Sequence, residues 1–265
     1  MTDAELIRRW LPYPRSPGAI RLYCLPHAGG SASAFRTWIA GLPRIAVSPL
    51  QLPGRETRLS HQPHHDMAPL ASELADIVLA TADENYAVYG HSLGALVGFE
   101  VLREIRRRGG PMPMHLLVSG SAAPQCPSDG WPIVREMNDD GVVHMLRRLG
   151  GTPESLLSDP GLLQMILPAV RADFSVKDSY RYQPEAPLDL PITVLAADRD
   201  PRAGSEQMAQ WREQTTGQFE LHTVGEGHFA VYEQVQVTQK YIAAALHRGA
   251  DRMVTPQARL DAGTT

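Results

Sequence analysis

Short apolar runs alternate with amphipathic stretches over most of the chain, and this alternation predicts strands separated by helices. The predicted strands, rich in aliphatic and aromatic residues, are 21–25, 44–50, 86–89, 115–120, 191–197 and 219–224. Between strands, apolar residues recur at the spacing of one helix face, as Leu70, Leu74, Ile77 and Val78 do. This order predicts an α/β protein with a mainly parallel, doubly wound sheet.

The alternation stops in residues 127–187, where only helical patterns occur, for example in 142–149 and 162–167. We interpret this stretch as a helical lid over the carboxyl edge of the sheet, where open α/β sheets bind ligands. The alternative is a small helical subdomain that only adds core. The predicted organisation is an α/β core at 1–126 and 188–248, a lid at 127–187 and a disordered tail at 249–265.

A strand pattern runs directly into a G-x-S-x-G sequence at residues 90–94, and a helical pattern follows at once. A serine on such a strand-to-helix corner is forced outward, where its hydroxyl can attack a carbonyl carbon. Gly90 and Gly94 allow the tight turn and the close approach of backbones that this corner needs. Ser92 is therefore the candidate nucleophile.

A serine hydroxyl needs a base to become nucleophilic, and the base needs an acid to orient it. Hydrolases of this fold supply the three groups in the order serine, carboxylate, histidine, from loops after successive strands. His228, which follows the last predicted strand, is the candidate general base. Asp200 is the candidate acid because of its offset beyond the preceding strand. Asp198 remains the alternative, and the unused carboxylate would be a loop residue or turn cap.

The reaction also needs donors for the oxyanion that develops on the attacked carbonyl. The backbone N–H of Leu93, next to the nucleophile, is one candidate. The second is the N–H of Ala28, in the glycine-rich loop 26–30 after the first predicted strand. The alternative for this loop is a plain glycine turn, and the side chain of His27 need not take part.

Composition excludes several classes of protein. The 265 residues are 43% hydrophobic and 20% charged, with a formal net charge of -4, so a nucleic-acid surface is not expected. The two cysteines, Cys24 and Cys126, lie far apart, which argues against a disulfide framework or zinc site and favours the reducing cytoplasm. Neither a signal peptide nor a membrane-spanning run is expected.

A cluster of possible metal ligands stands among prolines: His61, His64, His65 and Asp66. Their spacing matches no zinc pattern, so a polar loop is the favoured interpretation. We therefore expect no metal site at this cluster.

Six segments together resemble the type II thioesterases of the α/β-hydrolase superfamily, between about Arg21 and Tyr241. They are 25–30, 51–55, 89–95, 167–174, 197–201 and 227–229. The Pro-Gly-Arg and Arg-Ala-Asp-Phe sequences within them separate this family from generic esterases. Type II thioesterases are stand-alone enzymes that accompany non-ribosomal peptide synthetases and polyketide synthases, and the medium-chain acyl hydrolase of animal fatty acid synthase is similar.

The resemblance implies an α/β-hydrolase fold and hydrolysis of acyl groups from the phosphopantetheine thiol of carrier proteins, which clears aberrant groups from a synthase. The reaction that this resemblance implies requires no metal or bound cofactor. The resemblance also implies a carrier-protein domain as partner, and a monomer is the default expectation. Carrier proteins are usually acidic, so Arg55, Arg58, Arg147 and Arg148 are candidates for a basic docking face. The alternative for each is a scattered, solvated arginine.

Two other functions remain open from the residues alone. One is a carboxylic-ester hydrolase or acyltransferase that uses the same triad. The other is a carrier-binding module that has kept the fold without turnover, although an intact serine, histidine and aspartate set argues against it.

Overall fold

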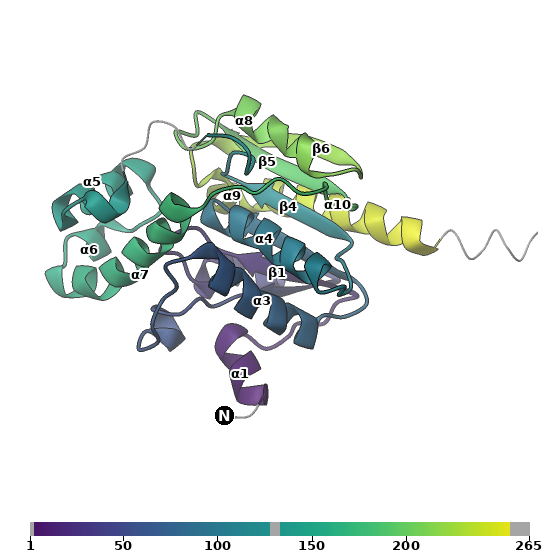
Figure 1. Ribbon diagram of the computed structural model, residues 1–265, viewed down its shortest axis with the longest axis horizontal. Helices are drawn as coiled ribbons and strands as arrows, with labels where there is room; N and C mark the ends of the chain where they lie inside the picture. The colour runs from purple at the N-terminus through teal and green to yellow at the C-terminus, as the bar shows by residue number, and fades with distance from the viewer. Residues whose placement is uncertain (1–2, 128–132, 255–265) are drawn as a thin grey trace, which may run out of the picture.

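The computed structural model describes residues 3–127 and 133–254, and it contains a six-stranded sheet in the order β2-β1-β3-β4-β5-β6 (Figure 1). Every neighbouring pair of strands in this sheet is parallel. The strands are β1 (Ile20–Leu25), β2 (Ile45–Pro49), β3 (Tyr86–His91), β4 (His115–Ser119), β5 (Ile192–Asp198) and β6 (Phe219–Glu226). This parallel sheet confirms the predicted fold class. Strands β1 to β4 are buried along their whole length, as expected when helices cover both faces of a parallel sheet.

Helices cover both faces of the sheet, and each face has its own apolar core. On one side lie α1 (Asp3–Trp10), α3 (Met67–Thr81), α4 (Leu93–Arg107), α8 (Ser205–Ala209) and the 3₁₀ helix η4 (Gln210–Gln214). On the other lie η1 (Ala32–Phe35), α2 (Arg36–Gly41), α9 (Ala230–Glu233) and α10 (Val235–Val254). Figure 1 shows α3 and α4 in front of the sheet and α10 behind it.

The order of strands reverses between β1 and β3, since the chain moves from β1 to β2 on one side and returns to β3 on the other. At such a reversal the loops after the two strands leave in opposite directions, which opens a crevice at the carboxyl edge. The loop after β1 and the turn after β3 meet there. These are the two segments in which the sequence predicts oxyanion donors and the nucleophile.

The segment between β4 and β5 forms a separate lobe, at the left in Figure 1. Its elements are η3 (Val134–Glu136), α5 (Asp139–Leu149), α6 (Glu154–Leu157) and α7 (Pro160–Ser179), and they share a small apolar core. Within the described part of this segment, every assigned element is a helix, as the sequence pattern predicts. A further short 3₁₀ helix, η2 (Glu56–Arg58), follows β2.

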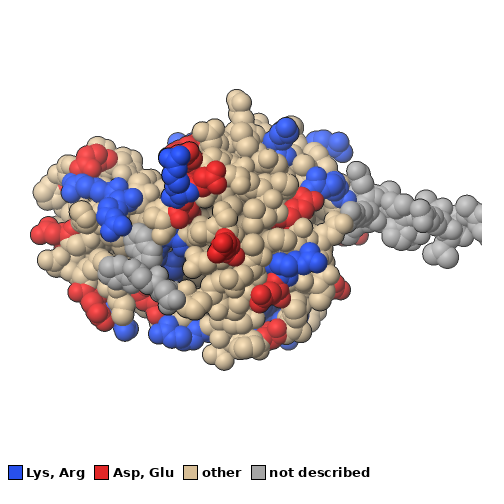
Figure 2. All heavy atoms as spheres, turned by 90° about the horizontal axis from the view of Figure 1, so that it is seen from above, with Lys and Arg blue, Asp and Glu red and all other residues tan. Residues whose placement is uncertain are grey.

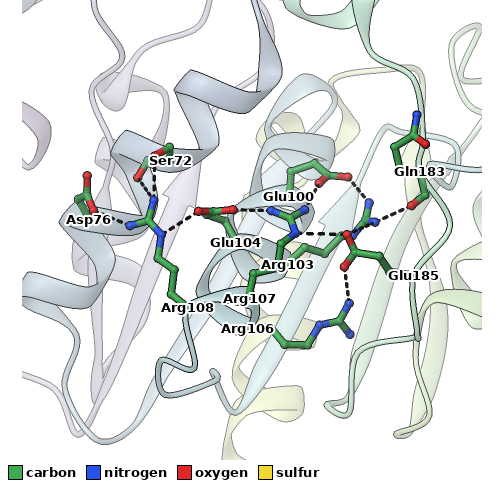
Figure 3. A network of polar contacts seen from close by, with 10 residues as sticks. All are labelled: Ser72, Asp76, Glu100, Arg103, Glu104, Arg106, Arg107, Arg108, Gln183 and Glu185. Atoms are coloured by element: carbon green, nitrogen blue, oxygen red, sulfur yellow. Dashed lines mark hydrogen bonds and ion pairs between the residues drawn. The ribbon is translucent and has the colours of Figure 1, made fainter.

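The chain that returns from the lobe is held to helix α4 by an ion-pair network (Figure 3). Arg103 lies between Glu100, at 2.6 Å, and Glu185, at 2.7 Å, and Arg106 contacts the same Glu185 carboxylate at 2.8 Å. Because Arg103 and Glu100 are buried, this contact is shielded from solvent better than a surface pair. The segment that follows α7 is therefore anchored to α4, the helix that begins beside Ser92.

Helix α10 continues to Val254, past the predicted end of the core at residue 248. The rest of the predicted tail, 255–265, lies outside the described residues. Among the described residues, no helix combines the length and apolar character that crossing a bilayer requires.

Candidate active site

Ser92 occupies the corner between β3 and α4 in a strained conformation, with φ 56° and ψ −116°. A positive φ is unfavourable for a residue with a side chain, and it persists only where the surroundings enforce it. Here the N–H of Ser92 donates to the carbonyl of Ser119 on β4, at 2.8 Å. A Cβ atom at Gly90 would overlap the backbone of Gly94, and one at Gly94 would overlap the carbonyl of Leu25. Both glycines of the motif are thus required by the close approach of backbones.

Ser92, His228 and Asp200 form a continuous hydrogen-bonded chain. The Nε2 atom of His228 lies 3.0 Å from Oγ of Ser92, and its Nδ1 atom lies 3.0 Å from each carboxylate oxygen of Asp200. Because a carboxylate only accepts hydrogen bonds, Nδ1 carries the proton and Nε2 is free to accept the serine proton. The structure thus brings together the three residues that the sequence predicts as nucleophile, base and acid.

Asp200, rather than Asp198, faces the imidazole. Asp198 is exposed at the end of β5, where its carbonyl accepts the N–H of Gly227 at 2.7 Å. The register between β5 and β6 shifts near Asp198, and Arg199 adopts a positive φ of 56°. This kink turns Asp200 inward, where its carboxylate also accepts the N–H of Arg202 at 2.8 Å.

The two predicted oxyanion donors line the same cavity as Ser92 and His228. Leu93 is the first residue of α4, so its N–H has no partner within the helix and lies at the positive end of the helix dipole. In the loop after β1, the N–H of Gly30 donates to His27 and that of Gly29 donates to Asp173, at 2.9 and 2.7 Å. Among the described residues, the N–H of Ala28 has no such partner, so it is available to a ligand.

A buried ion pair connects this loop to helix α7. Both amino groups of the Arg55 guanidinium contact the carboxylate of Asp173, and the Nη2 to Oδ1 distance is 2.8 Å. Nη1 of Arg55 also donates to the carbonyl of Gly30 at 3.2 Å. Arg55 and Asp173 come from the Pro-Gly-Arg and Arg-Ala-Asp-Phe segments. Their shared structural role is to fix the loop that carries Ala28.

For two of the four arginines considered for a basic docking face, the predicted role is wrong. Arg55 is buried against Asp173, and Arg58 is buried with its guanidinium 4.0 Å from the ring centre of Trp10. Neither can present its charge to a partner. Arg147 and Arg148 are exposed on α5, and Arg147 pairs with a surface glutamate. On the face shown in Figure 2, acidic and basic side chains lie near one another on the lobe at the left, so the docking role of α5 stays a prediction.

Two further histidines lie close to His228 and are neutral at ordinary pH. Burial, with the nearby charges of His228 and Arg55, lowers the pKa of His27 to about 3. Burial also lowers the pKa of His91 well below its usual value, and its Nδ1 atom lies 2.9 Å from Oγ of Ser119. Because the rings of His91 and His228 are 5.0 Å apart, a neutral His91 does not repel the imidazolium that forms on His228 during proton transfer.

Side chains of the proline-rich segment around His61 contact side chains from elsewhere in the chain. His61 lies 3.2 Å from Arg9, and His64 lies 3.4 Å from Glu73. No group of three or more metal-binding side chains occurs in the part of the chain that the structure describes.

The cavity beside Ser92 is lined by two basic side chains that the sequence analysis missed, those of Lys177 and Arg202. Its volume is about 20 Å³, enough for about one water molecule. Lys177 could have been found from helix spacing, because it follows the buried residues Val170 and Phe174 on one face of α7. Lys177 itself is half-buried, so it lies at the edge of this buried face and lines the cavity.

A parallel sheet, a serine on a strand-to-helix corner and a histidine–carboxylate pair from later strands define the α/β-hydrolase class. Within this class, the sequence model of the Thioesterase domain family matches residues 20–245. The chain therefore belongs to the thioesterase family and is a thioester hydrolase.

Related proteins agree with this assignment. The chain is 40% identical over 247 residues to thioesterase PikA5 of Streptomyces venezuelae, covering 88% of this chain and 85% of that protein. It is similar in structure to the RedJ thioesterase of the prodiginine biosynthetic pathway in Streptomyces coelicolor, with a TM-score of 0.80, 35% identity and 92% and 94% of the two chains covered. The type II thioesterase BorB, from the borrelidin biosynthetic cluster, gives a TM-score of 0.81 with 37% identity over 89% and 97% of the two chains. The sequence-based identification of the family is confirmed.

Proposed function

We propose that this protein hydrolyses acyl groups from the phosphopantetheine thiol of carrier proteins and thereby removes aberrant groups from a polyketide or non-ribosomal peptide synthase. The observation that carries the proposal is the buried hydrogen-bonded chain from Ser92 through His228 to Asp200. The names of RedJ and BorB support the biosynthetic setting. The enzyme acts as a cytoplasmic monomer with a carrier domain as its partner.

In the first half of the reaction, Oγ of Ser92 attacks the thioester carbonyl while Nε2 of His228 takes its proton. Asp200 holds the imidazole in the required tautomer and stabilises the positive charge that forms on it. The developing oxyanion accepts hydrogen bonds from the N–H groups of Ala28 and Leu93. His228 then protonates the departing pantetheine sulfur, and the acyl group remains on Ser92.

In the second half, His228 accepts a proton from water, which attacks the acyl-enzyme carbonyl. The same two N–H groups stabilise the second oxyanion, and His228 returns the proton to Ser92 as the free acid leaves. Each proton transfer in this reaction passes through His228, and both oxyanions form beside the N–H groups of Ala28 and Leu93. The triad and the two N–H groups thus serve both steps without a metal.

A panel of carrier proteins loaded with short-chain, medium-chain and aminoacyl groups tests the proposal, with loss of the acyl group followed by intact-protein mass. We expect release from at least some loaded carriers by the wild type and none above background with Ser92→Ala. Faster hydrolysis of p-nitrophenyl esters than of every carrier-bound thioester would instead favour the carboxylic-ester hydrolase. Hydrolysis that survives in Ser92→Ala would contradict the proposed mechanism.

A further inference from the structure

The imidazole of His228 packs against the buried ring of His91, the residue that precedes the nucleophile. The centres of the two rings are 5.0 Å apart. Gly120, directly after β4, lies against both rings, because a Cβ atom added there would be 2.5 Å from Cε1 of His91 and 3.2 Å from Cε1 of His228. A side chain at this one position would displace both rings. His91, His228 and the backbone of Gly120 therefore form one closely packed unit.

A buried hydrogen-bonded chain fixes the ring of His91. Its Nδ1 atom lies 2.9 Å from Oγ of Ser119, which in turn lies 2.6 Å from the hydroxyl oxygen of Tyr89. Among the described residues, Nε2 of His91 is buried without a hydrogen-bond partner. Burial lowers the pKa of His91 well below its usual value, so the ring is neutral. Ser119 is therefore the polar anchor that sets the rotation of this ring.

The contacts that hold His228 differ between the two halves of the reaction. In the free enzyme its ring is held at both nitrogens, by Oγ of Ser92 and by the carboxylate of Asp200. In the acyl-enzyme, Oγ of Ser92 is an ester oxygen without a proton, and neutral Nε2 has no proton to offer it, so their hydrogen bond is lost. Asp200 then holds the ring at Nδ1 alone. Because Nε2 must next accept a proton from water, packing against the neighbouring ring matters more in this half.

We propose that His91 is a positioning residue for deacylation: its ring, anchored on Ser119, keeps Nε2 of His228 beside the acyl carbonyl when Ser92 no longer holds it. This inference rests on the acyl-enzyme route of the proposed function. In that step His228 accepts a proton from water, and the water oxygen bonds to the acyl carbon. The bond from that carbon to Oγ of Ser92 then breaks as His228 returns the proton. His91 forms none of these bonds and acts through His228.

The experiment follows p-nitrophenyl butyrate, whose nitrophenolate leaves without being protonated, so that acylation depends less on His228 than deacylation does. Nitrophenolate release reports acylation, and the butyryl group on Ser92 is measured by intact-protein mass after acid quenching. We expect His91→Ala to slow the decay of the butyryl-enzyme about tenfold or more, so that it accumulates during turnover. Both kcat and KM should then fall together, whereas kcat/KM, which reports acylation, should stay within about threefold of wild type.

Ser119→Ala is the second variant, because it removes the anchor and leaves the His91 ring in place. The backbone carbonyl of Ser119, which accepts the N–H of Ser92, is unchanged. We expect the same accumulation of butyryl-enzyme, with a smaller loss of kcat than in His91→Ala. This variant decides the outcome if the larger cavity left by His91→Ala prevents folding.

His115→Ala is the matched control. His115 is also a buried histidine bound to a hydroxyl, since its Nε2 atom lies 2.8 Å from Oγ1 of Thr193. It begins β4, however, and so lies at the amino edge of the sheet, opposite the triad. We expect His115→Ala to lower Tm, as His91→Ala does, and to leave the acylated fraction at the wild-type level.

Three results would overturn the inference. The first is an acylated fraction at the wild-type level in both His91→Ala and Ser119→Ala. The second is an equal loss of kcat and kcat/KM in these variants, which would show that His91 supports both halves of the reaction alike. The third is accumulation of acyl-enzyme in His115→Ala as well, which would assign the effect to general loosening of the sheet. Failure of the proposed function would appear in the wild type instead, as a lack of release from every loaded carrier.

Discussion

Removing the charge of Asp173 should destabilise the protein and slow catalysis for two separate reasons. Oδ2 of this carboxylate accepts hydrogen bonds from the N–H of Gly29 and from Arg55, and Oδ1 accepts a second one from Arg55. In Asp173→Asn the side-chain amide has only one acceptor oxygen. Whichever way it turns, its NH₂ group faces a donor, and the Arg55 guanidinium stays buried without its counter-charge.

The expected magnitude follows from the burial of both partners, whose side chains are 7% and 4% exposed. Removing one partner of a buried ion pair costs about 3–5 kcal/mol. For a domain of this size, that loss lowers Tm by roughly 6–20 °C. The kinetic effect is separate: a shift of the loop that carries Ala28 weakens an oxyanion donor whose complete loss costs about 10²–10³-fold in kcat. We expect kcat to fall about 10- to 100-fold, with a smaller change in KM.

The assay combines thermal unfolding with thioester hydrolysis, measured well below the Tm of the variant so that unfolding does not mimic slow catalysis. The control is the double variant Arg55→Met/Asp173→Leu, in which two apolar side chains replace the pair. Such replacements are often neutral in stability, whereas the N–H of Gly29 still lacks its acceptor. We therefore expect the double variant to regain stability and to keep a low kcat. A kcat within about threefold of wild type in Asp173→Asn would refute the link between this pair and the oxyanion loop.

Three further outcomes follow from the site. Ser92→Ala should lose more than about 10³-fold in hydrolysis while its Tm stays close to that of the wild type. Asp200→Asn should lower kcat by roughly 10⁴-fold, because the amide favours the wrong imidazole tautomer, whereas Asp198→Asn should stay within about threefold. Lys177→Met should be more stable than wild type near neutral pH in denaturant titrations, because burial lowers the pKa of Lys177 in the folded state to about 7. The unfolded state therefore binds this proton more tightly, and the difference in stability should shrink as pH rises from about 7 towards 10.5.

The fold and the serine–histidine pair were predictable because they depend on local signals. Apolar residues repeat every two positions in strands and every 3.6 positions in helices, so both can be identified without knowing which elements they pack against. The G-x-S-x-G motif likewise predicts a turn between a strand and a helix from its own residues. His228 could be placed because a residue that follows the last strand of a parallel sheet lies at the same edge as Ser92. The choice between Asp198 and Asp200 was harder, since it depends on the kink at Arg199, which the residue types do not show.

The sequence could not reveal which arginines are buried. Arg55 and Arg58 look like solvated charges in a polar loop, and only the tertiary structure places a carboxylate against one and a tryptophan ring against the other. Arg55 and Asp173 are 118 positions apart, and no local pattern relates them. Both motifs were recognisable as features of the family, but their structural role, an ion pair between Arg55 and Asp173, is seen only in the folded chain.

The oxyanion loop, residues 26–30, follows strand β1 of the α/β core but makes contacts with the helical lobe. Ala28 packs against the apolar core of the lobe, and the N–H of Gly29 is held by Asp173 of α7. The cavity beside Ser92 is lined from both sides of this contact, by Ala28 of the loop, Leu146 and Leu149 of α5 and Phe174 of α7. Movement of α7 would carry Asp173 away from the loop and disturb the donor that the reaction needs. Displacement of Leu146 and Leu149 on α5 would instead leave the contacts between α7 and the oxyanion loop intact, because neither residue contributes to the Asp173 hydrogen bonds.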